Sequence, residues 1–74
     1  MKEIAPKIVI NPKIRFGKPV IKGTRVPVDL IVGKIAGGMT IEEVAKEYDL
    51  KKKDVLAALR YAAQVIKKES LIYV

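Results

Sequence analysis

Cysteine, histidine and tryptophan are absent from this chain, and phenylalanine occurs once among its 74 residues. Without cysteine the chain can form neither a disulfide nor a thiolate nucleophile, and without histidine it lacks the commonest general base. The same two absences remove the usual ligands of zinc. Because no remaining group acts as a base or nucleophile near neutral pH, we expect no enzymatic activity, no catalytic residue, no cofactor and no metal site.

Long apolar segments are also absent. No run approaches the roughly 20 apolar residues that cross a bilayer, and the N-terminal sequence Met1-Lys2-Glu3-Ile4-Ala5-Pro6 lacks the apolar core of a signal peptide. We therefore expect a cytoplasmic protein without a membrane partner. The length allows one domain, residues 1–74, and a chain this short buries only about 60% of its unfolded surface. A second copy or another partner would compensate for the small core.

Positive charge is in excess, with a formal net charge of +7 and an isoelectric point near 9.8. Residues 1–38 carry eight bases and two acids, whereas residues 39–74 carry seven bases and six acids. This asymmetry favours a polyanionic partner near the N-terminal half, and nucleic acid phosphates fit that description. The alternative is a lysine-rich protein of a heat-loving organism, which the presence of only one Asn and one Gln also fits.

The segment from Thr40 to Arg60 has the periodicity of two helices joined by a tight turn. It begins with a capping box, in which the Thr40 hydroxyl accepts from the Glu43 amide and the Glu43 carboxylate accepts from the Thr40 amide. Met39 and Val44 flank the box as a hydrophobic staple. The first helix then presents apolar residues at i, i+3, i+4 and i+7 spacing: Ile41, Val44, Ala45 and Tyr48.

A second periodic run follows the turn at Asp49-Leu50. Asp49 is a departure from the helix-turn-helix pattern, because a glycine would suit a left-handed backbone there, although Asp tolerates that conformation better than most residues. A short helix, a tight turn and a longer basic helix are the pattern of a DNA-reading helix-turn-helix. The alternative is a pair of amphipathic helices that only builds a core. In the second helix one stripe is apolar (Val55, Leu59, Ala62 and Ile66), and the outer face carries Lys53, Ala57, Arg60, Gln64 and Lys67.

The N-terminal third alternates between short β-favouring runs and turn residues, which predicts short strands in an arm or small sheet. The turn Lys22-Gly23-Thr24-Arg25 separates two of these runs, and Gly23 can adopt the positive φ that such a turn requires. Pro27 argues against a central position in a sheet for the run that contains it. The runs are Ile8-Val9-Ile10, Ile14-Arg15-Phe16, Val20-Ile21 and Val26-Pro27-Val28.

A further helix is predicted between the strands and the helix pair, with Asp29 as its N-cap and Gly37-Gly38 as its stop. The last residues, Ser70 to Val74, are β-favouring and apolar, so we expect a C-terminal strand that pairs with the N-terminal strands or with another chain. The predicted fold is therefore α+β and mainly helical. It has a three-helix core with the helix-turn-helix, short N-terminal strands and a C-terminal strand, in one winged-helix-like domain.

Three blocks of sequence occur in order over most of the chain: Gly17 to Val28, Gly38 to Val44 and Asp54 to Ala63. Together, and above all through the motif Gly-Lys-Pro-x-Ile-x-Gly-Thr-Arg in the first block, they resemble the domain of unknown function 433 family. The resemblance implies a small prokaryotic helix-turn-helix protein, grouped with antitoxins and often encoded beside a PIN-type ribonuclease toxin. Such proteins are expected to inhibit the toxin and to repress their own operon. One departure is Lys51, where family members commonly carry a Thr or Ser cap.

Lys51, Lys52 and Lys53 are the first candidate contacts to nucleic acid. They stand at the start of the second helix, where cations are unfavourable by roughly 0.3–1 kcal/mol each, and a broken local rule favours a function at that end. Arg60 lies two turns after Lys53 and could bind a guanine edge or a phosphate. The alternatives are an exposed, screened lysine run and an ordinary surface ion pair for Arg60.

Lys22 and Arg25 are the other two candidates, because a short basic turn beside a helix-turn-helix can contact the phosphate backbone as a wing or arm. The alternative is structural. In that interpretation, which we favour for Arg25, Thr24 and Arg25 hold the turn against the helices, and the Arg25 side chain binds backbone carbonyls or a carboxylate.

The patterns and the resemblance together predict a DNA-binding, antitoxin-like repressor of its own toxin–antitoxin operon. The expected partners are double-stranded DNA, a PIN-type ribonuclease toxin and a second copy of the chain. A homodimer is expected because two recognition helices one DNA turn apart gain affinity that one small module lacks. The alternative is a protein-interaction module that binds and neutralises a partner without binding DNA.

Overall fold

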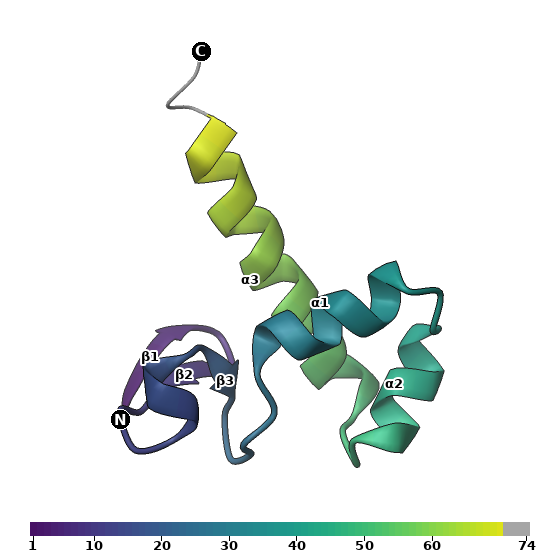
Figure 1. The fold of residues 1–74 in the computed structure, drawn as a ribbon, viewed down its shortest axis with the longest axis horizontal. Coiled ribbons are helices and arrows are strands. Elements are labelled where there is room, and N and C mark those ends of the chain that lie inside the picture. The colour runs from purple at the N-terminus through teal and green to yellow at the C-terminus, as the bar shows by residue number, and fades with distance from the viewer. Residues whose placement is uncertain (71–74) are drawn as a thin grey trace.

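The computed structural model describes the backbone of residues 1–70 and the side chains of residues 1–68. A small three-stranded sheet lies beside three helices, and the last helix extends away from both (Figure 1). This arrangement confirms the predicted α+β class with N-terminal strands. In chain order the elements are β1 (Lys2–Ala5), β2 (Ile8–Ile10), the 3-10 turn η1 (Arg15–Gly17), β3 (Val20–Ile21), α1 (Val28–Ala36), α2 (Ile41–Glu47) and α3 (Lys52–Ser70).

The sheet is antiparallel with the strand order β1-β2-β3. Its second and third strands confirm two predicted runs, with Ile8 of β2 directly opposite Ile21 of β3. β1 consists of exposed and half-buried residues, so its pairing with β2, rather than a local signal, specifies it. The predicted run at residues 26–28 makes a single bridge, between Pro27 and Val20, because proline has no N–H to donate to a ladder.

The predicted extended run at residues 14–16 is wrong, because it enters the turn η1 instead. Arg15 and Phe16 have left-handed φ angles of 52° and 56°, and Gly17 follows with φ 84°. For residues other than glycine this conformation costs roughly 1–2 kcal/mol each. Nothing in the types of Arg15 and Phe16 favours a left-handed backbone, so alternation of apolar and basic residues could not reveal the turn.

α1 begins at Val28, two residues earlier than an N-cap at Asp29 requires, so that prediction is wrong. Pro27 occupies the N-cap position, and the Val28 amide donates to the Pro19 carbonyl at 2.9 Å, which makes a side-chain cap for this amide unnecessary. Asp29 therefore lies in the first turn, where the helix dipole favours an acid. Its carboxylate accepts from Lys18 Nζ at 2.9 Å, and this hydrogen bond lowers the pKa of Asp29.

The end of α1 confirms the predicted glycine stop. Gly38 has φ +108°, a conformation that residues with a side chain rarely adopt. Its amide donates to the Ile35 carbonyl at 3.0 Å, and the Met39 amide donates to the Lys34 carbonyl at 3.1 Å. These two hydrogen bonds form a Schellman motif, which satisfies carbonyls at the end of the helix.

α2 begins with the predicted capping box. The Glu43 amide donates to Thr40 Oγ1 at 3.1 Å, and the Thr40 amide donates to Glu43 Oε1 at 2.8 Å. After the helix, Asp49 adopts φ 55°, as expected at its position, and the Leu50 amide closes the turn by donating to the Ala45 carbonyl at 2.8 Å. The turn therefore reverses the chain within a few residues and directs it into α3.

α3 is a helix of 19 residues and extends for roughly 28 Å. Its last residue is Ser70, so the first residue of the predicted C-terminal strand is helical. The remainder of that predicted strand, Leu71 to Val74, lies outside the described residues. Within residues 1–70 there is accordingly no C-terminal strand, and the strands are all N-terminal.

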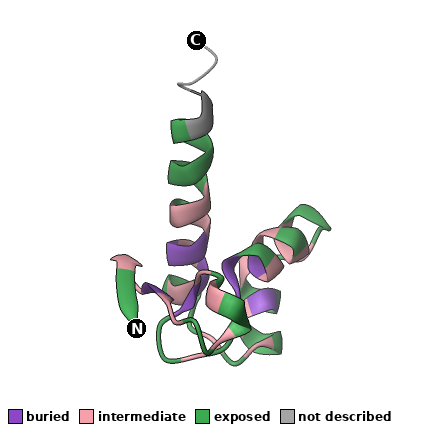
Figure 2. Cartoon of the chain, turned by 60° about the vertical axis from the view of Figure 1, so that its left-hand side comes forward, coloured by how far each residue is buried: buried purple, intermediate pink, exposed green. Residues whose placement is uncertain are grey.

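One apolar core joins the sheet to all three helices. Figure 2 shows the buried part of α3 in its N-terminal half, while the outer half is largely exposed. Each fully buried aliphatic side chain contributes roughly 1.5–3 kcal/mol of transfer free energy, so these contacts set the position of α3 relative to the sheet. The core cluster comprises Ile8, Ile21, Val28, Ile31, Val44, Val55, Ala57 and Ala58.

Candidate nucleic-acid interface

The predicted outer face of α3 is exposed except at one position. Lys53, Arg60, Gln64 and Lys67 all face solvent. Ala57, which helical periodicity places among them, is only 5% exposed and belongs to the core cluster. The sheet packs against α3 on this side, and helical periodicity could not reveal which edge of the face the N-terminal region covers. The placement of Ala57 on the outer face is therefore wrong, and the solvent-facing stripe is narrower than predicted.

The lysine run at the start of α3 is exposed at all three positions, Lys51, Lys52 and Lys53. Lys52 Nζ lies 3.3 Å from Glu42 Oε2, and both side chains are more than 60% exposed. An ion pair in such a setting contributes little and is screened by salt. No other ion pair within residues 1–68 involves this run, so its ammonium groups can bind an external anion at little cost.

Asp54 connects the start of α3 to the sheet. Its Oδ2 accepts from the Lys51 amide at 3.0 Å, which is the half of a capping box that the third residue of a helix supplies, and its Oδ1 lies 3.3 Å from Lys7 Nζ. Burial opposes ionisation of this carboxyl, whose side chain is 17% exposed, but the Lys51 amide and the Lys7 ammonium outweigh burial and lower the pKa of Asp54. The sequence did not predict the ion pair between Lys7 and Asp54, because 47 positions separate the two residues.

Lys22, one of the predicted contacts, lies beside this connection. Its amide donates to the Lys7 carbonyl at 2.8 Å, so the turn after β3 is adjacent to the residue that pairs with Asp54. The Lys22 ammonium lies 3.0 Å from Glu3 Oε1, and the hydrogen bond between them lowers the pKa of Glu3. The structure thus places the Lys22 backbone near the start of α3, while the Lys22 ammonium forms an exposed ion pair with Glu3.

Arg25, the other predicted contact in this turn, is exposed. The turn is held by Thr24, whose hydroxyl donates to the Ile21 carbonyl at 2.8 Å and accepts from the Val26 amide at 3.0 Å. Arg25 contributes its carbonyl, which accepts from Arg15 Nε at 3.2 Å. Within residues 1–68 no hydrogen bond or ion pair connects Arg25 to α3, so the predicted group of six bases divides into a part at α3 and a part at η1.

Arg60 is exposed and lines a cavity of about 340 Å3 between α3 and the turn after β1. Ile4, Ala5 and Pro6 form one wall, and Gln64 and Lys68 follow Arg60 along the helix. Among the side chains that the structure describes, no acid pairs with either Arg60 or Lys68. The sequence pattern did not single out Lys68, although its spacing of eight residues from Arg60 places both cations along one side of the helix.

Two kinds of site have no counterpart in the described part of the chain. Among the described side chains, those of residues 1–68, no group of three or more acidic side chains could hold a metal ion. None of the helices within residues 1–70 is long and apolar enough to cross a bilayer.

Comparison with known proteins gives a family and a partial structural likeness. The family described as "Protein of unknown function (DUF433)" matches residues 8–62. A curated relative, an "Uncharacterized protein" of Archaeoglobus fulgidus, is 61% identical over 23 residues, which are 31% of this chain and 64% of that protein. The X-ray crystal structure of Rv2018 from Mycobacterium tuberculosis matches with a TM-score of 0.65 and 31% identity, over 70% of this chain and 24% of that chain. The matched part is thus less than two thirds of either relative.

Proposed function

The chain belongs to the DUF433 family of proteins of unknown function, and from that premise we propose that it is a small helix-turn-helix protein that binds double-stranded DNA. The observation that carries the proposal is the exposure of Lys51, Lys52 and Lys53 at the start of a helix entered through a tight left-handed turn. α2, the turn and α3 then act as the helix-turn-helix, with α3 in the major groove.

In this proposal the N-terminal end of α3 contacts the DNA phosphates. The free amides and positive dipole end of a helix bind anions, and three ammonium groups at the same end add to that attraction. The exposed Glu42 carboxylate beside Lys52 exchanges readily for a phosphate, because a screened surface pair is worth little. Lysines that are unfavourable for the isolated helix therefore become favourable in the complex.

The solvent-facing stripe of α3 contacts the nucleobases in this proposal. Lys53 and Arg60 are seven residues apart, or roughly 10 Å along the helix axis, the rise of about three base pairs. The planar Arg60 guanidinium, which pairs with no acid among the described residues, can form two hydrogen bonds to a guanine edge. Ala57 is covered by the sheet and cannot contact a base, so we assign base recognition along this stripe to Lys53 and Arg60.

The sheet supports α3 and supplies a basic flank. The Lys7–Asp54 pair and the hydrogen bond between the Lys22 amide and the Lys7 carbonyl hold the turn after β3 near the start of α3. In the proposed complex Lys22 and Arg25 contact phosphates beside the groove that α3 enters. Lys22 would exchange its exposed Glu3 partner for phosphate, as Lys52 exchanges Glu42.

The biological role that we propose is that of an antitoxin-like repressor of its own toxin–antitoxin operon, acting as a homodimer. The support for this role is the resemblance to the family, whose members are often encoded beside a PIN-type ribonuclease toxin. A dimer would place two copies of α3 one DNA turn apart and would make the operator palindromic. The PIN-type ribonuclease is then the second partner.

The test is a mobility-shift titration on the DNA upstream of the protein's own gene. Lys52→Glu and Arg60→Ala should each weaken binding by about tenfold or more, because each removes a direct contact. Lys2→Glu, which makes the same charge change as Lys52→Glu at an exposed site on β1, is the matched control and should retain most of the affinity. The affinity of the wild type should fall with salt by about 0.9 log units per log unit of salt for each phosphate contacted.

If all variants bind with equal affinity, or if the complex is insensitive to salt, then the start and the solvent-facing stripe of α3 do not contact DNA. A protein-interaction module would then be the better account, and one observation favours it. Val65 and Ile66 are 37% and 60% exposed on the outer half of α3, beside a cavity of about 390 Å3 that Val32 and Tyr61 help to line. In that case Ile66→Glu should abolish a complex with the protein encoded by the neighbouring gene.

A further inference from the structure

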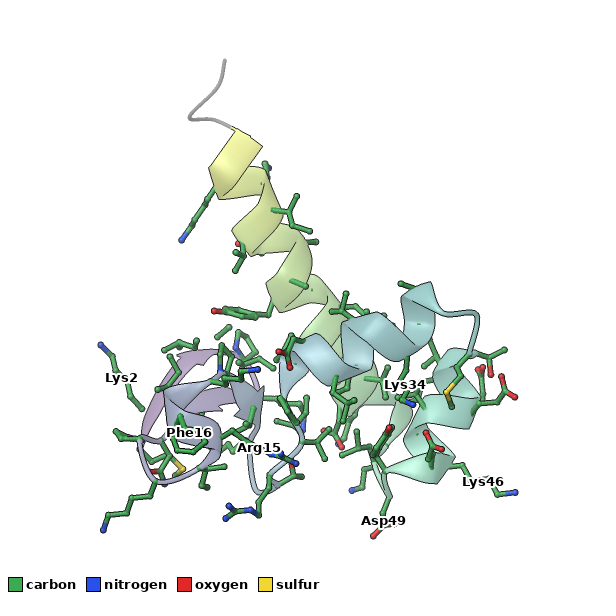
Figure 3. All side chains as sticks on the ribbon, in the orientation of Figure 1. Lys2, Arg15, Phe16, Lys34, Lys46 and Asp49 are labelled. Carbon is green, nitrogen blue, oxygen red and sulfur yellow. The ribbon has the colours of Figure 1, made fainter. Side chains whose placement is uncertain are left out.

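Phe16 is the most exposed large apolar side chain among the described residues. Its exposure of 102% means that the ring makes no more contact with the protein than it would in an extended peptide. It is also the only phenylalanine of the chain. Figure 3 labels Phe16 and Arg15 next to each other at the turn beside the sheet.

The backbone holds this ring in solvent by a defined conformation. Arg15, Phe16 and Gly17 all have positive φ, which is exceptional for a bulky residue such as phenylalanine. Hydrogen bonds fix the turn on both sides, because the Gly17 amide donates to the Ile14 carbonyl and the Lys18 amide to the Arg15 carbonyl, each at 3.1 Å. Strained residues of this kind concentrate at functional sites, where the surrounding structure imposes them.

The stretch of chain that contains Phe16 is rich in bases. Residues 11–28 contain five bases and no acid. Lys18 and Lys22 are paired with Asp29 and Glu3, but no ion pair within residues 1–68 involves the other three bases. The Arg15 side chain is positioned by its hydrogen bond to the Arg25 carbonyl. The bases without an acidic partner are Lys13, Arg15 and Arg25.

We infer that Phe16 stacks on a nucleobase while Arg15 and Arg25 bind the adjoining phosphates. An exposed ring among cations fits nucleic acid, because every base has a π-face and every nucleotide carries a negative charge. The base is either one in a single strand or one unstacked in a duplex by a wedging side chain. This inference rests on the proposed nucleic-acid binding and adds to it a contact that does not involve α3.

Phe16→Trp makes the test direct, because the chain has no tryptophan of its own. The single indole should be quenched on binding when it stacks on a base. The probes are the upstream duplex, a single-stranded oligonucleotide from the same DNA and inorganic polyphosphate. Polyphosphate offers charge without bases, so quenching by DNA alone identifies stacking, and the two DNA probes distinguish a duplex from a single-strand site. Ile66→Trp, on the outer half of α3, is the control and should not be quenched.

Phe16→Asn and Phe16→Tyr complete the test. Asn removes the ring and tolerates a left-handed backbone, so the melting temperature should not fall, whereas DNA affinity should fall about 5- to 100-fold, the effect of losing one base–aromatic stack. Tyr keeps a ring that can stack and should retain most of the affinity. A loss of affinity in Asn, its retention in Tyr and quenching in Trp support the inference together.

Three results would overturn it. If polyphosphate quenches the indole as strongly as DNA does, the residue at position 16 responds to phosphate charge and does not stack on a base. If Phe16→Asn binds DNA like the wild type while Lys52→Glu does not, the proposed function stands and the stacking contact is wrong. If Phe16→Asn keeps its DNA affinity but loses a complex with the protein encoded by the neighbouring gene, Phe16 is an anchor for a protein partner.

Discussion

The helices and the sheet of this protein are held by interactions of different range. Except at the start of α1, where the Val28 amide donates to the Pro19 carbonyl, the helix boundaries are satisfied within a few residues. Examples are the Thr40–Glu43 capping box, the Lys51–Asp54 cap and the Schellman motif around Gly38. These devices require no other part of the chain. In these segments the local sequence preference agrees with the overall fold.

The sheet depends instead on residues distant in sequence. Its strands have only four, three and two residues, and sheets so short are marginal without packing against another element. Ile8 and Ile21 supply that packing by joining the core cluster with the helices, and Lys7 pairs with Asp54 on α3. We therefore expect the sheet to form only when the helices cover its other face.

The largest expected effect tests this dependence. Ile21→Ala, at a position 1% exposed on β3, should destabilise the protein by about 2–5 kcal/mol, because it removes core volume shared by the sheet and the helices. Urea unfolding followed by circular dichroism measures the loss. A domain of this length has roughly 4–11 kcal/mol in total, so Ile21→Val, at about 0.5–1.5 kcal/mol, serves where the alanine variant does not fold.

Ile10→Ala is the control, because Ile10 is only half-buried on the neighbouring strand and should matter less. Hydrogen exchange adds a second measurement. In Ile21→Val the amides of the sheet should lose protection before those of α2, since only the helix boundaries are satisfied locally. Equal loss of protection in both regions would contradict the difference in range.

The same difference explains which parts of the fold could be predicted from the sequence. The capping box, the left-handed Asp49 and the stop at Gly37-Gly38 are patterns of a few residues whose chemistry permits one local structure. β2 and β3 were also predicted, because their runs are apolar and β-branched. β1 could not be predicted, since its residues are exposed or half-buried and it is ordered by pairing with β2.

The candidate site divides in the same way. Exposure of Lys51 to Lys53 follows from the charge of lysine, and exposure of Arg60 follows from its charge together with helical periodicity. The burial of Ala57 does not, because it depends on the edge of α3 against which the sheet packs. The ion pair between Lys7 and Asp54 depends on tertiary structure, and no local sequence pattern predicts it. The exposed, left-handed Phe16 in η1 could not be predicted from a local pattern either.

The second prediction concerns Asp54, which belongs to both regions through its cap and its ion pair. Asp54→Ala removes both and should cost about 1 kcal/mol. Asp54→Asn keeps an oxygen that can accept from the Lys51 amide and should cost less. Lys7→Met, which retains most of the aliphatic stem, removes the pair from the other side, and a double-mutant cycle isolates the coupling between the two charges.

The lowered pKa of Asp54 fixes the direction in which the stability of these variants should change with pH. The pKa of Asp54 is lowered in the folded protein below its ordinary value of 3.8. Its ionised form therefore adds stability above pH 3.8, and that stability is lost as the pH falls through the lower pKa of the folded state. Thermal unfolding should show wild type more stable than Asp54→Asn near neutrality and the difference disappearing below pH 3.8. A difference that grows towards acid pH would contradict the lowered pKa.

The smallest expected effect compares two left-handed residues, one in each region. Asp49 in the turn between α2 and α3 has φ 55°, and Lys7 in the turn between β1 and β2 has φ 67°. Asp49→Gly relieves the strain but enlarges the entropy of the unfolded chain, so we expect a gain in stability of no more than about 1 kcal/mol. Lys7→Gly relieves similar strain and also breaks the pair with Asp54, so it should give no gain. Urea unfolding of both variants decides the matter, because equal gains would mean that the long-range ion pair contributes nothing to holding the sheet on α3.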